Sequence, residues 1–353
     1  MTGPFFSSWV FVCIQAVSRM IRHPEEAMIL THKIALDPIG VGAPSGAMTP
    51  NEIAAKAAPT KPHTHTPPAP FIIGVSRSGT TLLRLMLDAH SQLAIPAETH
   101  FIPELCADPP RDGAVCLARL RAMPTWEDFH LEGTDFAARL ESLVPFDLAE
   151  ALRLFFGCYA RTQGKPRWGD KTPPYVEQVA AIGALLPEAR FVHILRDGRD
   201  VALSYRDKWF GPGTDLTAAA RLWRDRILAA RAQAERLEPG RYLELRFEDL
   251  IAAPEHELRR VCTFLELPFE PGMLDYHQHA ASRLDELGDR RDDKGRVKVP
   301  RERRLSIHAN TTRPPDPAQS GKWRTGLTPE EIARFEREAG DLLTALGYGL
   351  AEV

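Results

Sequence analysis

The stretch "FIIGVSRSGTTLLRLMLDAH", from Phe71 to His90, decides the fold class of this 353-residue chain. Its first five residues are mostly apolar and β-branched, as in a buried parallel strand, and the residues after Gly79 have helical spacing. A glycine-bounded loop between a strand and a helix is typical of a phosphate-binding loop. One position departs from the common pattern, because Thr80 stands where that loop has a lysine.

The missing lysine restricts what the loop can bind. In the common loop the lysine reaches the β- and γ-phosphates, and the next hydroxyl holds magnesium. Without it a magnesium-bound triphosphate is poorly held, whereas backbone N–H groups at a helix N-terminus still suit one 5′-phosphate that carries a small transferable anion. We therefore expect no metal, and an anion bound by Arg77, Ser78, Gly79, Thr80 and Thr81. The alternative is an ordinary strand–turn–helix with a glycine bend.

After Pro70 the sequence alternates between strands and helices, which predicts an α/β fold with a parallel, P-loop-type sheet covered by helices on both faces. We expect one domain over residues 70–350, with a helical cap at 114–164. In the helix after Gly79 the leucines and Met86 are expected to be buried, with Arg84 and Asp88 pointing outward. Ligands of such sheets bind at the carboxyl ends of the strands.

Two segments differ in composition from the expected domain. Residues 1–69 are rich in Ala, Pro and Thr towards their end, which predicts a disordered leader whose true start the sequence leaves open. Residues 283–304, "RLDELGDRRDDKGRVKVPRERR", read as a flexible, solvated charged insertion. The alternative for the basic stretch "VKVPRERRLSIHANTTRP", residues 297–314, is a loop that contacts phosphate.

Charge and cysteine content exclude several classes of protein. A net charge of −3 provides no field that would recruit nucleic acid. Five cysteines without a C-x-x-C pair argue against a disulfide framework and a zinc site, so we expect a cytoplasmic protein. The apolar run near the N-terminus is too short to be an integral membrane segment. The oligomeric state stays open.

Two further groups could bind phosphate. Arg196 directly follows an apolar strand, and Ser204 comes two helical turns later, so a guanidinium and a hydroxyl could hold a second phosphate. The alternative is a surface salt-bridge cluster of Arg196 with Asp197, Arg199 and Asp200. In "SGKWR", Lys322 precedes Trp323 and could close over a nucleotide.

In combination and order, "VSRSGTTLLRLMLDAH", "AETH", "WGDKTPP", "ILRDGRDVALS" and "GKWR" resemble the sulfotransferases that use 3′-phosphoadenosine 5′-phosphosulfate (PAPS), and are most similar to their bacterial and protein-tyrosine sulfotransferase-like branch. The resemblance extends from Phe71 to about Tyr348. It implies a P-loop-like fold and in-line transfer of a sulfuryl group from PAPS to a hydroxyl acceptor, releasing 3′,5′-adenosine bisphosphate.

The resemblance also implies roles for matching residues. The loop from Arg77 to Thr81 would hold the 5′-phosphosulfate, Arg196 and Ser204 the 3′-phosphate, and Lys322 would lie near the cofactor. Lys171 matches the lysine that steadies the leaving oxygen, and Thr311 or Thr312 a hydroxyl that contacts the transition state. The tyrosine-specific enzymes place their base in a Glu-Thr-Arg run; here the run is Glu98, Thr99, His100, so the base stays open between Glu98 and His100.

Two other functions compete with this interpretation. A P-loop kinase-like phosphotransferase would need the absent lysine and a metal. A non-catalytic nucleotide-binding protein would keep the loop without needing Glu98 and Lys171. The acceptor itself, whether carbohydrate, small molecule, lipid or protein tyrosine, is left open by the sequence.

Overall fold

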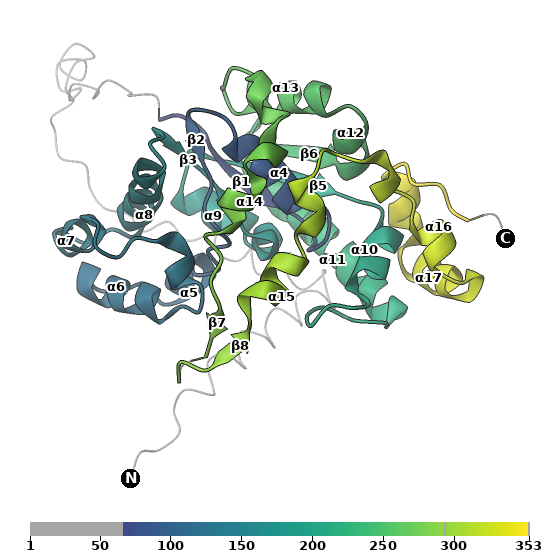
Figure 1. Cartoon of the computed structure of the whole chain (residues 1–353), viewed down its shortest axis with the longest axis horizontal. Coiled ribbons are helices and arrows are strands. Elements are labelled where there is room, and N and C mark those ends of the chain that lie inside the picture. The colour runs from purple at the N-terminus through teal and green to yellow at the C-terminus, as the bar shows by residue number, and fades with distance from the viewer. Residues whose placement is uncertain (1–65, 293, 352–353) are drawn as a thin grey trace, which may run out of the picture. The chain divides into compact units, whose positions relative to one another are not determined.

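A four-stranded parallel sheet organises the structure, a computed structural model that describes residues 66–292 and 294–351 (Figure 1). The strand order is β4-β1-β5-β6. The strands are β1 (Ala69–Ile73), β4 (Asp170–Lys171), β5 (Ala189–Leu195) and β6 (Tyr242–Arg246). The expected parallel α/β architecture is therefore confirmed. The expected leader lies outside the described residues up to position 65, and Ala69 already begins β1.

Helices cover both faces of the sheet because side chains alternate along its strands. Phe71 pairs with Phe191 and packs, with Ile73, among side chains of the cap and of α9 (Val179–Leu185). Ile72, on the other face, packs against α4 (Thr80–Asp88), α12 (Phe247–Ala252) and α13 (Pro254–Phe264). Beyond the carboxyl ends of β1 and β5 lies a third apolar cluster, built from α10 (Gly198–Tyr205), α11 (Leu216–Ala234), α16 (Trp323–Gly326) and α17 (Pro329–Ala345).

The segment expected as a helical cap is helical. It contains α6 (Gly113–Ala122), the short 3-10 helix η1 (Trp126–Phe129), α7 (Phe136–Glu141) and α8 (Leu148–Thr162). α5 (Ile102–Ala107) precedes it, and a short pair of parallel strands, β2 (Leu93–Ala94) and β3 (Arg167–Trp168), brackets the whole region. Phe155 of α8 packs edge-on against Phe101 and Phe129, so the cap has its own aromatic core. Among the described residues no helix is long and apolar enough to cross a membrane.

The charged run 283–304 is a solvated insertion only in part, which corrects the expectation from its composition: residues 294–298 are exposed, but both ends of the run pack against the domain. It continues α14 (Ala280–Leu284) into the antiparallel strands β7 (Arg290–Arg291) and β8 (Val297–Val299) and then α15 (Arg301–Ser306). Glu286 and Arg304 are both buried. Arg304 forms an ion pair with Asp128 of the cap at 2.6 Å.

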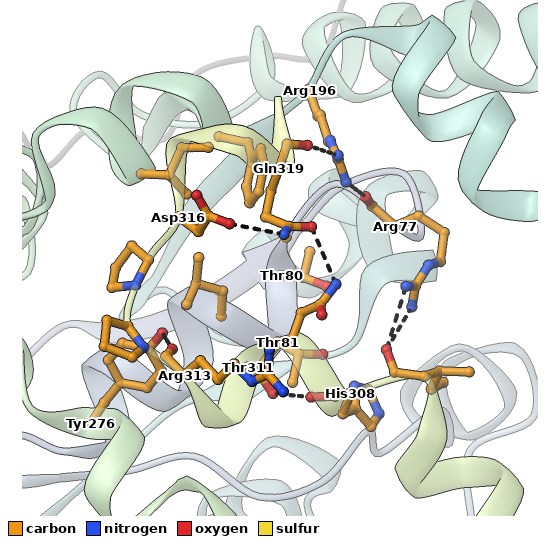
Figure 2. Close-up of a pocket in the computed structure, with 18 residues that line it drawn as sticks. Arg77, Thr80, Thr81, Arg196, Tyr276, His308, Thr311, Arg313, Asp316 and Gln319 are labelled. Carbon is orange, nitrogen blue, oxygen red and sulfur yellow. Dashed lines mark hydrogen bonds between the residues drawn. The ribbon is translucent and has the colours of Figure 1, made fainter. Parts of the chain in front are cut away.

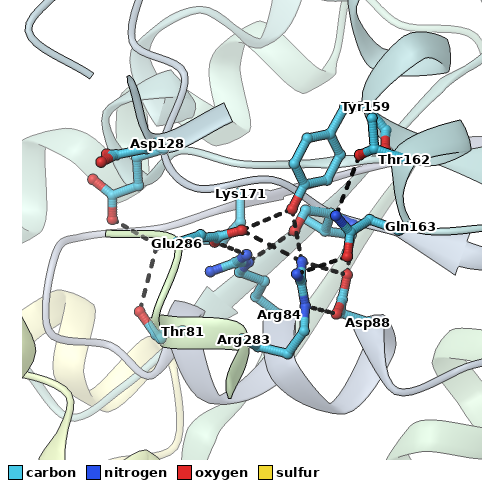
Figure 3. Close-up of polar contacts among 12 residues, drawn as sticks. Thr81, Arg84, Asp88, Asp128, Tyr159, Thr162, Gln163, Lys171, Arg283 and Glu286 are labelled. Atoms are coloured by element: carbon cyan, nitrogen blue, oxygen red, sulfur yellow. Dashed lines mark hydrogen bonds and ion pairs between the residues drawn. The ribbon is translucent and has the colours of Figure 1, made fainter. Parts of the chain in front are cut away.

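The same run explains a second wrong expectation, that Arg84 and Asp88 of α4 point outward. Both are buried, with 2% and 3% of their surface exposed (Figure 3). Arg84 pairs with Glu286, and Asp88 pairs with Arg283 at 2.6 Å. Tyr159 of α8 donates its hydroxyl to Glu286 at 2.8 Å. Charges that a lone helix would expose are thus satisfied by a distant segment that covers it.

Candidate functional site

The loop between β1 and α4 has the backbone of an anion site. Gly74 lies so close to β5 that a Cβ there would be 2.6 Å from the Ile194 carbonyl oxygen, and a Cβ on Gly79 would be 2.4 Å from the Phe247 ring. Gly79, with φ of 98°, is the N-cap of α4 and supplies no side-chain acceptor to the helix. The N–H groups of the first turn of α4 are therefore left for an external anion. Arg77 has φ of 78°, a strained conformation for a non-glycine residue.

A first cavity opens beside this loop (Figure 2). Thr80 and Thr81 lie on its wall with Arg77, whereas Ser78 is buried beneath the loop, where its N–H donates to the Val75 carbonyl. The remaining wall comes from segments far along the chain, and includes Arg196, Phe247, Tyr276, Asn310, Thr311, Arg313 and Gln319. The cavity is thus cationic at the loop and partly apolar opposite it, which suits a nucleotide.

Arg196 lies on the wall of this cavity with unused hydrogen-bonding capacity. Its guanidinium donates to the carbonyl oxygens of Arg77 at 3.0 Å and Gln319 at 2.6 Å, and stacks 4.5 Å from the Phe247 ring. Its Nε is buried without a partner among the described residues. Burial lowers the pKa of Arg196, although Asp200 opposes this. Such a donor is prepared for an anionic ligand.

Ser204 lies behind the cavity wall. Its Oγ accepts a hydrogen bond from Arg77 Nε at 3.0 Å, so Ser204 and Arg77 are held together. The alternative, a salt-bridge cluster of these charges, is present but buried and not at the surface: Arg199 pairs with Asp197 at 2.8 Å, and Arg196 lies 3.8 Å from Asp200. Asp200 also accepts the backbone N–H groups of Gly321 and Trp323.

The "GKWR" segment supports the cavity from outside. Trp323 is buried and packs 3.6 Å from the Arg199 guanidinium carbon, so it does not stack on a nucleotide. Lys322 is exposed and outside both cavity walls, with its Nζ donating to the side chain of Gln319 at 2.7 Å. Thr311 lines the first cavity and donates to the His308 carbonyl; Thr312 does not line it.

A second cavity brings together the three side chains expected to be catalytic. Lys171 Nζ donates to Glu98 Oε1 at 2.6 Å and to Thr81 Oγ1 at 3.4 Å. The other carboxylate oxygen of Glu98 lies 3.0 Å from His100 Nε2. A continuous polar chain therefore joins His100, through Glu98 and Lys171, to the phosphate loop.

A buried network holds the loop that carries Glu98 and His100. The hydroxyl of Thr99 donates to Asp170 at 2.8 Å and lies 2.8 Å from the Tyr175 hydroxyl, and its backbone N–H donates to Thr172 at 2.9 Å. Asp170 lies on β4, and Thr172 and Tyr175 come shortly after this strand. The strand therefore fixes the position of the loop. His100 has φ of 59°, so it too is held in a strained conformation.

Electrostatics keeps Glu98 ionised. Burial alone would favour its neutral form, but Lys171 and the hydrogen bond to His100 outweigh burial and hold the pKa of Glu98 well below its usual range. Burial also lowers the pKa of Lys171, with Glu98 opposing. Close to Thr81, burial lowers the pKa of His308 to about 3, so this imidazole is neutral at neutral pH.

The two cavities share part of their walls. Arg77, Thr80, Thr81, Ile307 and His308 line both. His308 follows α15, and Arg290 of the second cavity belongs to β7, so both come from the region of the charged run. His308 lies in the stretch 297–314, for which a loop that contacts phosphate was the alternative, and this stretch contributes to the wall of the first cavity. Sequence reasoning missed Arg290, because no motif marks it.

Among the described residues no three His, Cys, Asp or Glu side chains form a group that could hold a metal ion. Arg77 at the shared wall and the N–H donors of α4 match an anion.

Comparison with known proteins gives this arrangement a family. Residues 68–271 match the model of the sulfotransferase family. The chain is 30% identical over 216 residues to an uncharacterized protein of Aquifex aeolicus, covering 59% of this chain and 26% of that protein. It is 27% identical to the nodulation protein NoeE of Sinorhizobium fredii (79% and 65% covered), and 25% identical to a protein-tyrosine sulfotransferase of Drosophila melanogaster (80% and 52% covered).

Solved structures show the same fold. The sulfotransferase domain from the curacin biosynthetic pathway superposes with a TM-score of 0.55 at 23% identity, covering 81% of this chain and 99% of that domain. The chain spans between about a quarter and two thirds of the length of the relatives named above. With the family model matched over more than half of its length, this chain belongs to the sulfotransferase family.

Proposed function

We propose that this protein transfers a sulfuryl group from PAPS to a hydroxyl acceptor. The observation that carries the proposal is the shared wall, where a cavity with an anion loop and Arg196 meets a cavity with a carboxylate–lysine pair. A donor bound in the first cavity and an acceptor bound in the second would meet at Arg77 and Thr81. PAPS supplies the sulfuryl group when bound: the S–O bond to its 5′-phosphate breaks as the bond to the acceptor oxygen forms.

The residues of the first cavity would hold the two ends of the donor. The N–H groups of the α4 first turn, with Arg77, would bind the 5′-phosphosulfate, and Arg196 the 3′-phosphate, with Ser204 fixing Arg77. Lys322, exposed outside the cavity, would act only after the loop around Gln319 moved. The apolar side of the wall would take the adenine.

Glu98 is the acceptor's base in this proposal, and His100 orients it. The carboxylate lies on the second cavity, is ionised, and is held on both of its oxygens. Its lowered pKa makes it a weak base while Lys171 is paired with it. If Lys171 moved towards Thr81 and the departing 5′-phosphate oxygen of PAPS, the pKa of Glu98 would rise. Glu98 would therefore become a stronger base at the step in which Lys171 stabilises the leaving group.

Cofactor identity is tested by isothermal titration calorimetry of the full chain without magnesium. We expect 3′,5′-adenosine bisphosphate to bind at least tenfold more tightly than ADP or ATP. In Arg196→Ala this preference should disappear, because the 3′-phosphate loses its guanidinium. Arg161→Ala, at an exposed arginine outside both cavities, is the matched control and should bind as the wild type does. Binding of ATP only with magnesium, regardless of a 3′-phosphate, would contradict the proposal and favour a kinase.

We also propose a cytosolic location. The four described cysteines, Cys106, Cys116, Cys158 and Cys262, are free thiols. Burial raises the pKa of each, so they are unreactive as well as unpaired. Thiols in this state suit a reducing compartment.

A further inference from the structure

Five cationic side chains line the second cavity, and only Glu98 there is a carboxylate. Three of the five are neutralised: Arg84 by Glu286, Arg304 by Asp128, and Lys171 by Glu98. Arg77 belongs to the wall shared with the first cavity and is proposed to contact the donor. Arg290 is the fifth cation, and neither a carboxylate nor the proposed donor accounts for it.

Arg290 has no carboxylate partner among the residues that the structure describes. Its Nη2 lies 3.2 Å from His100 Nε2, and its Nε is buried without a hydrogen-bond partner in the described part of the chain. Burial lowers its pKa, while the more distant Glu98 opposes this. A guanidinium that is largely removed from water without a counter-charge is costly, and an anionic ligand would remove that cost.

The backbone directs this side chain into the cavity. Arg290 and Arg291 form β7, whose register against β8 is interrupted between the two residues, and bulges of this kind re-aim side chains. Arg291 does not line the cavity: it is 46% exposed and pairs with Asp289 at 3.0 Å. Of two adjacent arginines, one is solvated and paired, and the other is enclosed and unpaired.

The contact with His100 places Arg290 next to the residues proposed to activate the acceptor hydroxyl. His100 Nε2 lies 3.0 Å from Glu98 and 3.2 Å from Arg290, so one nitrogen faces an acceptor and a donor. A neutral imidazole nitrogen either donates to Glu98 or accepts from Arg290, but does not do both. An anion that accepts the hydrogen bonds of the Arg290 guanidinium would leave His100 Nε2 free to donate to Glu98. Binding that anion would thereby complete the orientation of the base.

We propose that Arg290 binds a carboxylate of the acceptor, so that the acceptor is a hydroxy acid. A guanidinium binds a carboxylate through two parallel hydrogen bonds, which fixes orientation as well as charge. The body of this acceptor is apolar, because Pro173, Pro174, Trp209, Phe210, Leu284 and Leu287 line the rest of the cavity. This inference rests on the proposed function, since it assigns the acceptor of the same reaction.

The test compares hydroxy acids with their neutral methyl esters. Calorimetry in the presence of saturating 3′,5′-adenosine bisphosphate would measure binding of 3-(4-hydroxyphenyl)propanoate and 3-hydroxyoctanoate, each beside its ester. In the wild type we expect at least one acid to bind tenfold or more tightly than its ester. Arg290→Met should reduce that acid to the level of the ester, and Arg290→Lys should lose part of the preference. Arg291→Met should behave as the wild type.

Several outcomes would overturn the inference. These are equal binding of acid and ester, no binding of either acid, or a preference that survives in Arg290→Met. Binding of an acidic tyrosine peptide without either small acid would also overturn it, in favour of a protein acceptor. Bisphosphate affinity, measured first on each variant, shows that the variant is folded. The same measurement separates the two proposals. If the wild type does not bind the bisphosphate, the proposed cofactor is refuted, and the comparison of acid with ester is then made without bisphosphate.

Discussion

At the scale of single residues, the chemistry depends on one carboxylate with two partners. Glu98 is held by Lys171 on one oxygen, and His100 lies within hydrogen-bond distance of the other, so its position is largely defined before any acceptor binds. Preorganisation of this kind is what a general base requires, since the acceptor proton must be within hydrogen-bond reach of it.

Glu98→Gln should therefore lower kcat for sulfuryl transfer by roughly a hundredfold or more, because the amide cannot accept the proton. Binding of 3′,5′-adenosine bisphosphate should change little, since Glu98 is absent from the first cavity. Single-turnover kinetics with radiolabelled PAPS measures the first effect and calorimetry the second. Glu104→Gln, at an exposed glutamate of α5, is the control. If Glu98→Gln keeps wild-type turnover and His100→Ala loses it, the histidine is the base instead.

At the scale of elements, β4 supports the catalytic loop through a buried carboxyl. Burial raises the pKa of Asp170 to about 7, although the hydroxyls of Thr99 and Thr172 oppose this. One oxygen accepts those hydroxyls, and the other is buried without a partner among the described residues. The folded state thus binds a proton that the unfolded chain releases near pH 4.

This predicts how stability depends on pH. Between about pH 4 and pH 7 the folded protein binds more protons at Asp170 than the unfolded chain does, so Asp170 makes the free energy of unfolding fall as pH rises. His193 and His308, whose pKa values burial lowers to about 4 and about 3, contribute with the opposite sign below pH 6.5. The slope from Asp170 is up to about 1.4 kcal/mol per pH unit. Asp170→Asn keeps an oxygen acceptor and does not titrate, so its free energy of unfolding should change with pH by a more positive slope than that of the wild type. Urea unfolding at pH 5 and pH 7.5 measures both slopes, and identical slopes would show that Asp170 is not responsible.

At the scale of the whole molecule, the first cavity is assembled from segments spread over most of the described chain. The phosphate loop, Arg196 directly after β5, α12, and residues between Tyr276 and Gln319 all contribute to its wall. A ligand that bridges these segments binds only the folded state, so it stabilises the fold as a unit.

We therefore expect 3′,5′-adenosine bisphosphate at a hundred times its Kd to stabilise the protein by about 2.7 kcal/mol. Differential scanning calorimetry should show this as a rise in Tm of several degrees. Arg196→Ala should remove most of the rise in Tm at the same ligand concentration. The Tm of the variant without ligand is compared with that of the wild type as a control for folding. A rise of equal size with ADP would contradict a role for the 3′-phosphate.

Local sequence was enough to predict the sheet and the phosphate loop. β1 and β5 are short apolar runs, and Gly79 can adopt its positive φ at the start of α4 without a Cβ clashing with Phe247. The apolar residues of these strands and the glycine of the loop are themselves part of the elements that they predict. Glu98, His100 and Lys171 were predicted from the resemblance of their motifs to the sulfotransferases, and all three line the second cavity.

Tertiary structure alone decided the environment of the charges. Arg84 and Asp88 are buried because Glu286 and Arg283, some two hundred positions away, pair with them. Arg290 and Arg291 are identical in sequence and adjacent, yet one is enclosed in a cavity and the other exposed. Whether a charge is solvated, paired or left for a ligand depends on what packs against it, and no local pattern of residues contains that information.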